Sequence, residues 1–288
     1  MGLATAIRPL AALGELLRAC STEVTPRDRR GIEAAGQLLA KGSEVFIAAV
    51  PGDGPELMIS AAARLRALDL TPVPHLAARN FAGLQAFDRV LGGLRDKAGV
   101  DRVLALGGDR DRPAGDLHSS QQLIASGAFA RRGVRKVFIA CYPEAHPHLS
   151  AEVLEQVRAA KLRALADQGL EAELISQFCF QPGPVIDLAR RLRAQGIQAP
   201  YRVGVAGPAE RTVLVRYGLM CGIGPSLRAL KQRQALARNV LAGETPEVLL
   251  TEIAVARAAD PALGIGGVHL FTFGALERSA RFALSLRG

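Results

Sequence analysis

The chain has 288 residues, of which 49% are apolar and 22% are charged, and so apolar a composition excludes intrinsic disorder. This length fits two average domains or one large α/β barrel of about 250 residues. The formal net charge of +9 first suggests an anionic partner such as a nucleic acid.

Short apolar runs alternate along the chain with longer amphipathic stretches, which predicts strands and helices in turn. The expected strands lie near 17–24 and at 44–50, 71–78, 102–107, 136–141, 172–178, 201–206 and 267–273. The expected helices lie at 55–68, 81–94, 119–130, 150–168 and 184–195, in several segments of 208–258, and at 276–286.

Eight strands, each followed by helix, decide the predicted fold class. Apolar strands between amphipathic helices are typical of a parallel sheet covered by helices. Eight such units favour a closed (β/α)8 TIM barrel over an open doubly wound sheet. No Pro-, Ser- or Gly-rich linker divides the chain, so we expect one α/β domain over residues 1–288.

Cysteine usage and hydropathy indicate the compartment. None of the four cysteines forms a C-x-x-C pair, so neither a disulfide framework nor a zinc ribbon is expected. No apolar run approaches the roughly 18–20 residues of a membrane span, and the N-terminal segment has no convincing signal-peptide cleavage site. These features predict a reduced, cytoplasmic protein without a membrane partner.

The basic residues do not form a nucleic-acid footprint. They are dispersed, only five of the 36 are Lys, and their longest runs are pairs such as Arg131-Arg132. The chain has no Trp and three Tyr, so aromatic platforms for stacking bases are scarce. We therefore predict no nucleic-acid partner.

Polar side chains collect where the predicted strands end. In a parallel barrel these positions meet at one rim, which is where barrel enzymes place their active sites. The residues are Glu23, His75, Asp109, the segment Tyr142–His148, and Gln177 with Phe178 and Phe180 beside it.

Each of these residues also has a purely structural interpretation. Glu23 also fits a surface carboxylate, His75 a core histidine, and Asp109 a turn residue that bonds its own backbone. His146 and His148 flank a proline beside Glu144, but their i,i+2 spacing is weak ligand evidence, so no metal site is predicted. The chain also lacks a complete G-x-G-x-x-G after a strand and any P-loop, which argues against Rossmann and P-loop sites.

Five segments in order carry a family resemblance that extends over about residues 19–283. They are 74–76, 104–109, 140–147, 176–180 and 268–274, and the Tyr-Pro-Glu-x-His-Pro string beginning at Tyr142 is the most specific. With these segments the sequence resembles the methylenetetrahydrofolate reductase family, flavoproteins built on an eight-stranded α/β barrel.

The resemblance implies an FAD-dependent oxidoreductase of one-carbon metabolism and methionine biosynthesis. It would interconvert methylenetetrahydrofolate and methyltetrahydrofolate with NAD(P)H, the hydride passing through the flavin. By position, Glu23 matches the general acid that protonates the folate nitrogen as the five-membered ring opens. Asp109 matches the aspartate beside flavin and pterin, where a carboxylate stabilises a cationic iminium.

The resemblance also implies two sets of binding residues. The cofactor set is His75, Gly107, Gly108, Asp109, Ser119, Ser120, Ala140, Tyr142, His146, Glu155 and Lys161. The substrate set is Glu23, Asp109, Gln177, which matches a pterin-binding glutamine, and Phe180.

The sequence departs from the family pattern at several places. The segment after Glu23 is not aromatic, the second strand ends in Ala48-Ala49-Val50-Pro51, and Glu155 and Lys161 are six residues apart where the family has seven. Two alternatives therefore stay open: the same site working oxidatively in demethylation, and a non-catalytic folate- or flavin-binding subunit. The choice between NADH and NADPH and the formation of a homo-oligomer also stay open.

Overall fold

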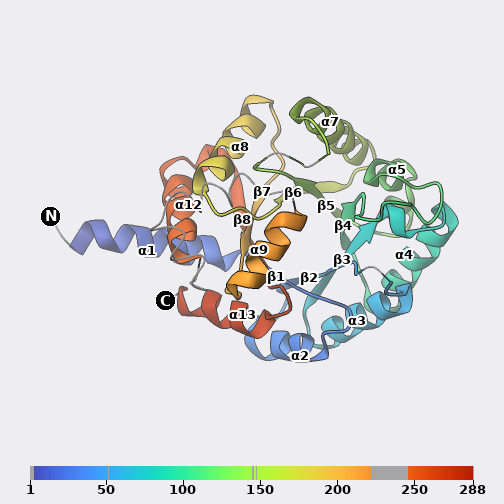
Figure 1. Ribbon diagram of the computed structural model, residues 1–288, viewed down its shortest axis with the longest axis horizontal. Helices are drawn as coiled ribbons and strands as arrows, with labels where there is room; N and C mark the ends of the chain where they lie inside the picture. The colour runs from blue at the N-terminus through green and yellow to red at the C-terminus, as the bar shows by residue number, and fades with distance from the viewer. Residues whose placement is uncertain (1–2, 51, 145, 147, 222–245, 288) are drawn as a thin grey trace. The chain divides into compact units, whose positions relative to one another are not determined.

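The computed structural model describes residues 3–50, 52–144, 146, 148–221 and 246–287. Eight strands close into a barrel in the order β1-β2-β3-β4-β5-β6-β7-β8 (Figure 1). Adjacent strands run parallel, as in β2 with β3, β3 with β4 and β7 with β8. The predicted (β/α)8 barrel is therefore confirmed.

The chain forms two compact units: residues 1–22, 141–151 and 174–288 make up unit 1, and residues 23–140 and 152–173 make up unit 2. Four elements have residues in both units: β1 (Cys20–Val24), β5 (Lys136–Cys141), α7 (Ala151–Asp167) and β6 (Glu171–Ser176). Each unit is described by itself below.

Unit 2 is built from strands that alternate with helices. Its strands besides the end of β1 are β2 (Glu44–Ile47), β3 (Thr71–Ala77), β4 (Arg102–Leu106) and β5 (Lys136–Cys141) up to Ala140. Its helices are α2 (Arg29–Leu38), α3 (Pro55–Ala67), η1 (Ala78–Asn80), α4 (Leu84–Ala98), α5 (Ser120–Ala125), α6 (Ala128–Arg131) and most of α7 (Ala151–Asp167).

The strands of unit 2 are held in register by their buried apolar side chains. Phe46 pairs with Val73, and Leu104 pairs with both His75 and Phe138. Phe46, Val73 and Phe138 are fully buried. A slip of one residue would turn each of these side chains to the opposite face; since residues on both faces are buried, the fit of each side chain among its neighbours, rather than burial alone, fixes the register.

Unit 1 carries the rest of the barrel. Its strands besides the parts of β1, β5 and β6 are β7 (Tyr201–Ala206) and β8 (Ile265–Phe271). Its helices are α1 (Leu3–Arg18), α8 (Pro182–Ala194), α9 (Arg211–Met220), α12 (Glu247–Ala259), η2 (Pro261–Leu263) and α13 (Leu276–Ser285). α12 packs against α1 and α8 (Figure 1).

Several predicted elements need correction. The expected helix over 119–130 is two helices, α5 and α6, because Gly127 adopts a left-handed conformation with φ +70° between them. The last strand ends at Phe271 rather than Phe273, so Thr272 and Phe273 lie in the loop that follows. The helices α1 and α2 were not among the predicted elements, and 222–245, inside the predicted helical region, lies outside the described residues.

No helix in the described part of the chain is long and apolar enough to span a lipid bilayer.

Candidate functional site

Glu23 lies at the carboxyl end of β1 in unit 2 and is half-buried. The next residue, Val24, accepts a hydrogen bond at its carbonyl from the Ala48 backbone N–H at 2.8 Å. This bond joins the end of β1 to the residue that follows β2. The carboxyl group predicted as the general acid therefore stands on a strand end that is fixed by its neighbour.

His75 lies inside β3, because Leu76 and Ala77 continue the strand by pairing with Ala105 and Leu106. β3 ends at Ala77, one residue from its predicted end at 78, so the expectation that His75 stands at the strand end is wrong. The imidazole makes an edge contact with the Phe46 ring, with centroids 5.9 Å apart and planes at 75°. It stands in an aromatic layer rather than in the loop that follows the strand.

The Gly107-Gly108-Asp109 turn follows β4 and requires glycine. Gly108 has φ +98°, and a Cβ placed on it would stand 3.1 Å from the Ala77 Cβ. The Arg79 backbone N–H donates to the Gly107 carbonyl at 2.9 Å. With its backbone fixed in this way, the turn presents Asp109 as an exposed carboxylate.

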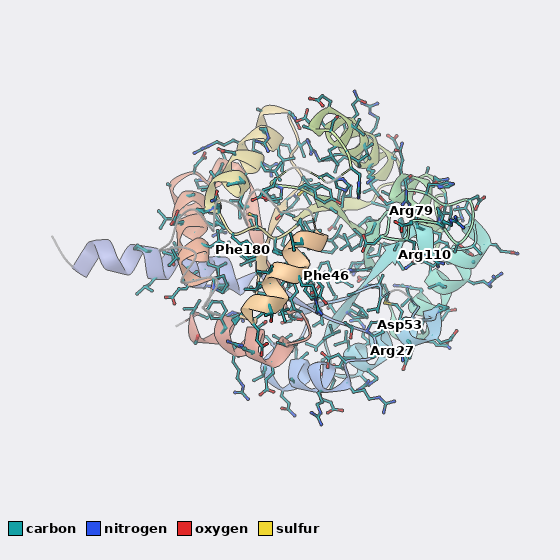
Figure 2. The ribbon with its side chains drawn as sticks, viewed as in Figure 1. Arg27, Phe46, Asp53, Arg79, Arg110 and Phe180 are labelled. Atoms are coloured by element: carbon teal, nitrogen blue, oxygen red, sulfur yellow. The ribbon has the colours of Figure 1, made fainter. Side chains whose placement is uncertain are left out.

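Arg79 and Gln122 hold the loop that leads from this turn to α5. The Arg79 guanidinium donates to the carbonyls of Arg110 at 3.0 Å and His118 at 3.2 Å (Figure 2). Gln122 Oε1 accepts the backbone N–H of His118 at 2.7 Å and of Ser119 at 3.1 Å. Of the two predicted cofactor residues here, Ser119 is half-buried and Ser120 is 2% exposed.

Helix α7 carries the predicted pair Glu155 and Lys161, both half-buried. At 100° per residue, a spacing of six places them about 120° apart around the helix, whereas seven would nearly align them. The helix therefore does not put Glu155 and Lys161 on one face. Arg158, which is not among the residues predicted from the sequence, lies three residues before Lys161, close to the same face of the helix, and is 8% exposed.

Burial is the cause that lowers the pKa of Lys161 from 10.5 to about 8. A lysine desolvated in this way is a natural binding partner for an anion, because the anion would compensate the buried charge.

We expect Lys161→Met to be more stable than the unchanged protein at pH 7, and we expect the difference to shrink as the pH rises. Between about pH 8 and 10.5 the unfolded chain still holds the Lys161 proton that the folded chain has lost, so the stability of the unchanged protein rises with pH. Urea denaturation at intervals from pH 7 to 10 measures this difference. Lys97→Met, at a lysine whose side chain is 62% exposed, is the control. A gap that stays constant with pH contradicts the assignment.

The loop after β5 in unit 1 orders His146. Its ring contacts the edge of Tyr142 with centroids 4.7 Å apart, and its Nδ1 faces the backbone N–H of His148 at 3.1 Å. Burial, together with the nearby His148, lowers the pKa of His146. Because Nδ1 accepts the backbone N–H, the neutral ring carries its proton on Nε2 and can donate it to a ligand.

Gln177 follows β6 and lies beside the end of β5 within unit 1, since its backbone N–H donates to the Cys141 carbonyl at 2.9 Å. Its side-chain Oε1 accepts the backbone N–H of Phe178 at 3.0 Å. The side-chain carbonyl is therefore already hydrogen-bonded, and the side-chain amide N–H groups can donate to a ligand.

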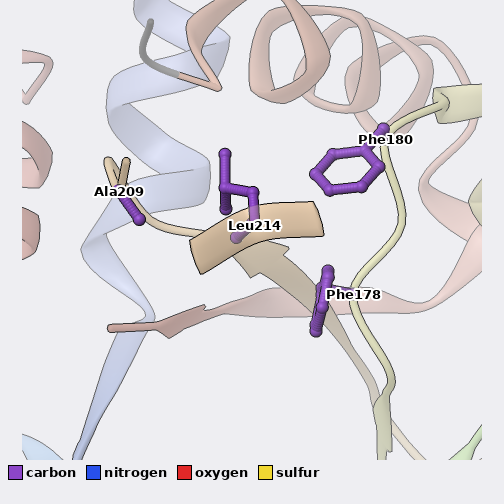
Figure 3. Close-up of a cluster of buried hydrophobic side chains, with 5 residues drawn as sticks. Phe178, Phe180, Ala209 and Leu214 are labelled. Atoms are coloured by element: carbon purple, nitrogen blue, oxygen red, sulfur yellow. The ribbon is translucent and has the colours of Figure 1, made fainter. Parts of the chain in front are cut away.

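An apolar cluster of unit 1, which we call the Phe178 cluster, is formed by Phe178, Phe180, Ala206, Ala209 and Leu214 (Figure 3). Figure 3 shows Phe178 and Phe180 on the segment after β6, with Leu214 on α9 beside them. Phe180, predicted to touch the substrate, is 5% exposed within it.

Three partly buried aromatic rings pack against the Phe178 cluster, and none of them is among the site residues predicted from the sequence. They are Tyr217, Phe271 and Phe273. Phe273 adopts φ +51°, which is unusual for so large a side chain, and its ring lies 4.8 Å from Tyr217 and 5.4 Å from Phe178.

A cavity beside the Phe178 cluster in unit 1 is too small for a ring system. Its volume is about 20 Å³, and Cys179, Phe180 and Leu214 contribute to its walls. This is room for about one water molecule. Burial raises the pKa of Cys179 to about 12, so this thiol does not supply a thiolate near neutral pH. Among the described residues, no group of three or more His, Cys, Asp or Glu is placed to hold a metal ion.

The structure thus brings the predicted residues into two sets. In unit 2, Glu23 lies at the carboxyl end of β1 and Asp109 follows β4. His75 lies on β3, between the strand that carries Phe46 and the strand that leads into the glycine turn. In unit 1, Tyr142 and Gln177 follow the joined ends of β5 and β6.

No protein-family model matches the chain. Among solved structures, the chain is similar to dihydropteroate synthase from Thermus thermophilus, at 17% identity and a TM-score of 0.49, over 93% of this chain and 92% of that one. It is also similar to 3-dehydroquinate dehydratase from Aquifex aeolicus, at 9% identity and a TM-score of 0.49, over 93% and 96%. A third similarity is to sialic acid aldolase from Ruminococcus gnavus, at 13% identity and a TM-score of 0.48, over 93% and 72%. At these values the similarities carry no argument about the reaction of this chain.

Proposed function

We propose that the protein is an FAD-dependent oxidoreductase that interconverts methylenetetrahydrofolate and methyltetrahydrofolate with NAD(P)H. The observation that carries the proposal is the half-buried carboxyl group of Glu23 at the carboxyl end of a barrel strand. Barrel enzymes hold their reacting groups at this position, and the ordered motifs of the sequence resemble those of a family whose general acid stands there.

Glu23 and Asp109 divide the acid and charge roles in this proposal. Opening the five-membered ring of methylenetetrahydrofolate needs a proton on the departing nitrogen, and Glu23 donates it. The ring-opened iminium is cationic, and the Asp109 carboxylate, which follows the fixed glycine turn, stabilises that charge. The side-chain amide N–H groups of Gln177 are suited to bind the carbonyl oxygen of the pterin.

The residues present fit a flavin dinucleotide in part. Lys161 suits a phosphate, because the anion would compensate its desolvated ammonium group. His146 can donate a hydrogen bond from its Nε2–H. The missing Cβ of Gly108 makes room for Ala77, whose Cβ would stand 3.1 Å from it, so this glycine supports the turn that carries Asp109. Glu155 does not fit beside Lys161, because it points about 120° away around the helix. When bound, the flavin carries the hydride between nicotinamide and folate.

The absorbance spectrum of the purified protein tests the proposal. We expect a yellow protein, or a colourless one that turns yellow on addition of FAD, and NADH or NADPH oxidation that depends on methylenetetrahydrofolate. The reverse reaction, from methyltetrahydrofolate, is assayed with the same material because one set of residues serves both directions. A protein that neither binds FAD nor turns over either folate disproves the proposal.

A further inference from the structure

Two reverse turns in unit 2 follow neighbouring strands. After β1, the Asp28 backbone N–H donates to the Thr25 carbonyl at 3.1 Å, with Pro26 and Arg27 at the corner. Proline is favoured at this second position of a turn. Asp28 then caps α2, its Oδ1 accepting the Gly31 N–H at 2.8 Å. The turn therefore fixes the backbone of Arg27.

The second turn follows β2. The Asp53 backbone N–H donates to the Val50 carbonyl at 3.1 Å, and Gly52 has φ +85° at the third position, where glycine is favoured. Helix α3 begins two residues later at Pro55. This turn fixes the backbone of Asp53.

An ion pair joins the two turns. Arg27 Nε donates to Asp53 Oδ1 at 2.7 Å, and the two side chains are side by side in Figure 2. The Asp53 side chain is 7% exposed and the Arg27 side chain 66% exposed. The buried Asp53 carboxylate therefore fixes the orientation of the Arg27 guanidinium through its Nε–H group. Within the described residues, that bond is the one hydrogen bond of the Arg27 side chain, so the Nη1 and Nη2 edge is available.

The charges around this edge favour an anion. The Nη1 and Nη2 groups of an arginine match the two oxygens of a carboxylate or phosphate. Arg29 and Arg30 are exposed in the first turn of α2, which contains no acidic residue. Cations are unfavourable at a helix N-terminus; the Asp28 carboxylate at the N-cap offsets one of these two charges, and a bound anion would offset the other.

We propose that Arg27, oriented by Asp53, binds an anionic group of a ligand that reacts at Glu23, and so selects ligands by charge. The inference rests on the proposed function, since Glu23 lies on the same strand end four residues before Arg27. The anionic group is a carboxylate or a phosphate. Its two sources are the glutamate tail of the folate and the extra phosphate of NADPH.

Kinetics with ligands of different charge test the site. The kcat and KM are measured for methylenetetrahydrofolate carrying one or three glutamates, and for NADH and NADPH. We expect Arg27→Gln to raise the KM of the triglutamate folate or of NADPH by about tenfold. The KM of the monoglutamate folate or of NADH, and the kcat, should change by less than about twofold. A rise for the triglutamate identifies the folate tail, and a rise for NADPH identifies the phosphate. Arg27→Lys, which keeps the charge without the fork, and Asp53→Asn are expected to give smaller rises of the same kind.

Arg190→Gln is the matched control, because Arg190 is also 66% exposed and also pairs with an aspartate, Asp187, through a bond of 3.2 Å. It removes the same charge from α8 in unit 1. We expect no change in the ratio of the KM values for triglutamate and monoglutamate folate, or in the ratio for NADPH and NADH. Normal turnover with unchanged charge discrimination in Arg27→Gln overturns the anion site alone. Absence of flavin binding and of folate turnover in the unchanged protein overturns the proposed function and this inference with it.

Discussion

Glu23→Gln is expected to lower folate turnover by about 10²- to 10⁴-fold, which is the range for losing a positioned general acid. Glutamine keeps the size and hydrogen-bonding shape of the side chain but cannot release a proton. Since the half-buried Glu23 stands at the end of β1, beside the backbone bond from Ala48 to Val24, the substitution should leave the strand end in place.

The expected loss is confined to the step that needs a proton. Reduction of the protein-bound FAD by NAD(P)H, which is measured as the loss of flavin absorbance, needs no proton from Glu23. Its rate should stay within about twofold of that of the unchanged protein. Reoxidation by methylenetetrahydrofolate should show the full decrease. Stopped-flow measurement of the two half-reactions therefore separates a lost acid from a damaged binding site.

Glu33→Gln is the matched control, since Glu33 is a 66% exposed glutamate on α2 of the same unit, 3.7 Å from Arg64. Its turnover should equal that of the unchanged protein. If Glu23→Gln retains full turnover, Glu23 is not the acid. If both half-reactions slow equally, its contribution is to binding rather than to proton transfer.

The barrel could be predicted from the sequence because its strands are short apolar runs. β5 and β7 match their predicted bounds, and β4 differs by one residue. α2 could not be predicted in this way, since its ten residues include two glycines and two arginines in the first turn. It forms because Asp28 caps it and because Ile32 and Ala35 are buried, a tertiary contribution that local propensity does not contain.

The candidate site could be predicted only where a residue's place on a strand decides its position. Asp109 was found because it follows an apolar strand and two glycines. The Arg27–Asp53 pair depends on two turns 26 residues apart meeting in space, which spacing does not reveal. The Thr-Pro-Arg-Asp and Pro-Gly-Asp strings were the signal, since each predicts a turn directly after a strand. Phe273 was missed because the apolar run places it inside the last strand, whereas its left-handed backbone lies two residues beyond the end of β8.

Phe178→Ala is expected to destabilise the protein by about 3–5 kcal/mol, the usual cost of removing a buried phenylalanine ring. Phe178 is 1% exposed, and its ring lies 5.3 Å from Phe271, 5.4 Å from Phe273 and 5.9 Å from Phe180, all within unit 1. Since aromatic contacts surround the ring on several sides, one small rearrangement cannot fill the space that alanine leaves.

Guanidinium denaturation measures this cost, with Leu219→Ala as the control on α9. The Leu219 side chain is 67% exposed, so its removal should change the free energy of unfolding by less than about 0.5 kcal/mol. The buried Phe178 ring anchors the backbone N–H that donates to Gln177 Oε1, so the loss of the ring should also raise the KM for folate where the variant remains folded. A cost below about 1 kcal/mol would mean that the rings around Phe178 close over the gap, and the Phe178 cluster would then be a deformable surface rather than a fixed support for Gln177.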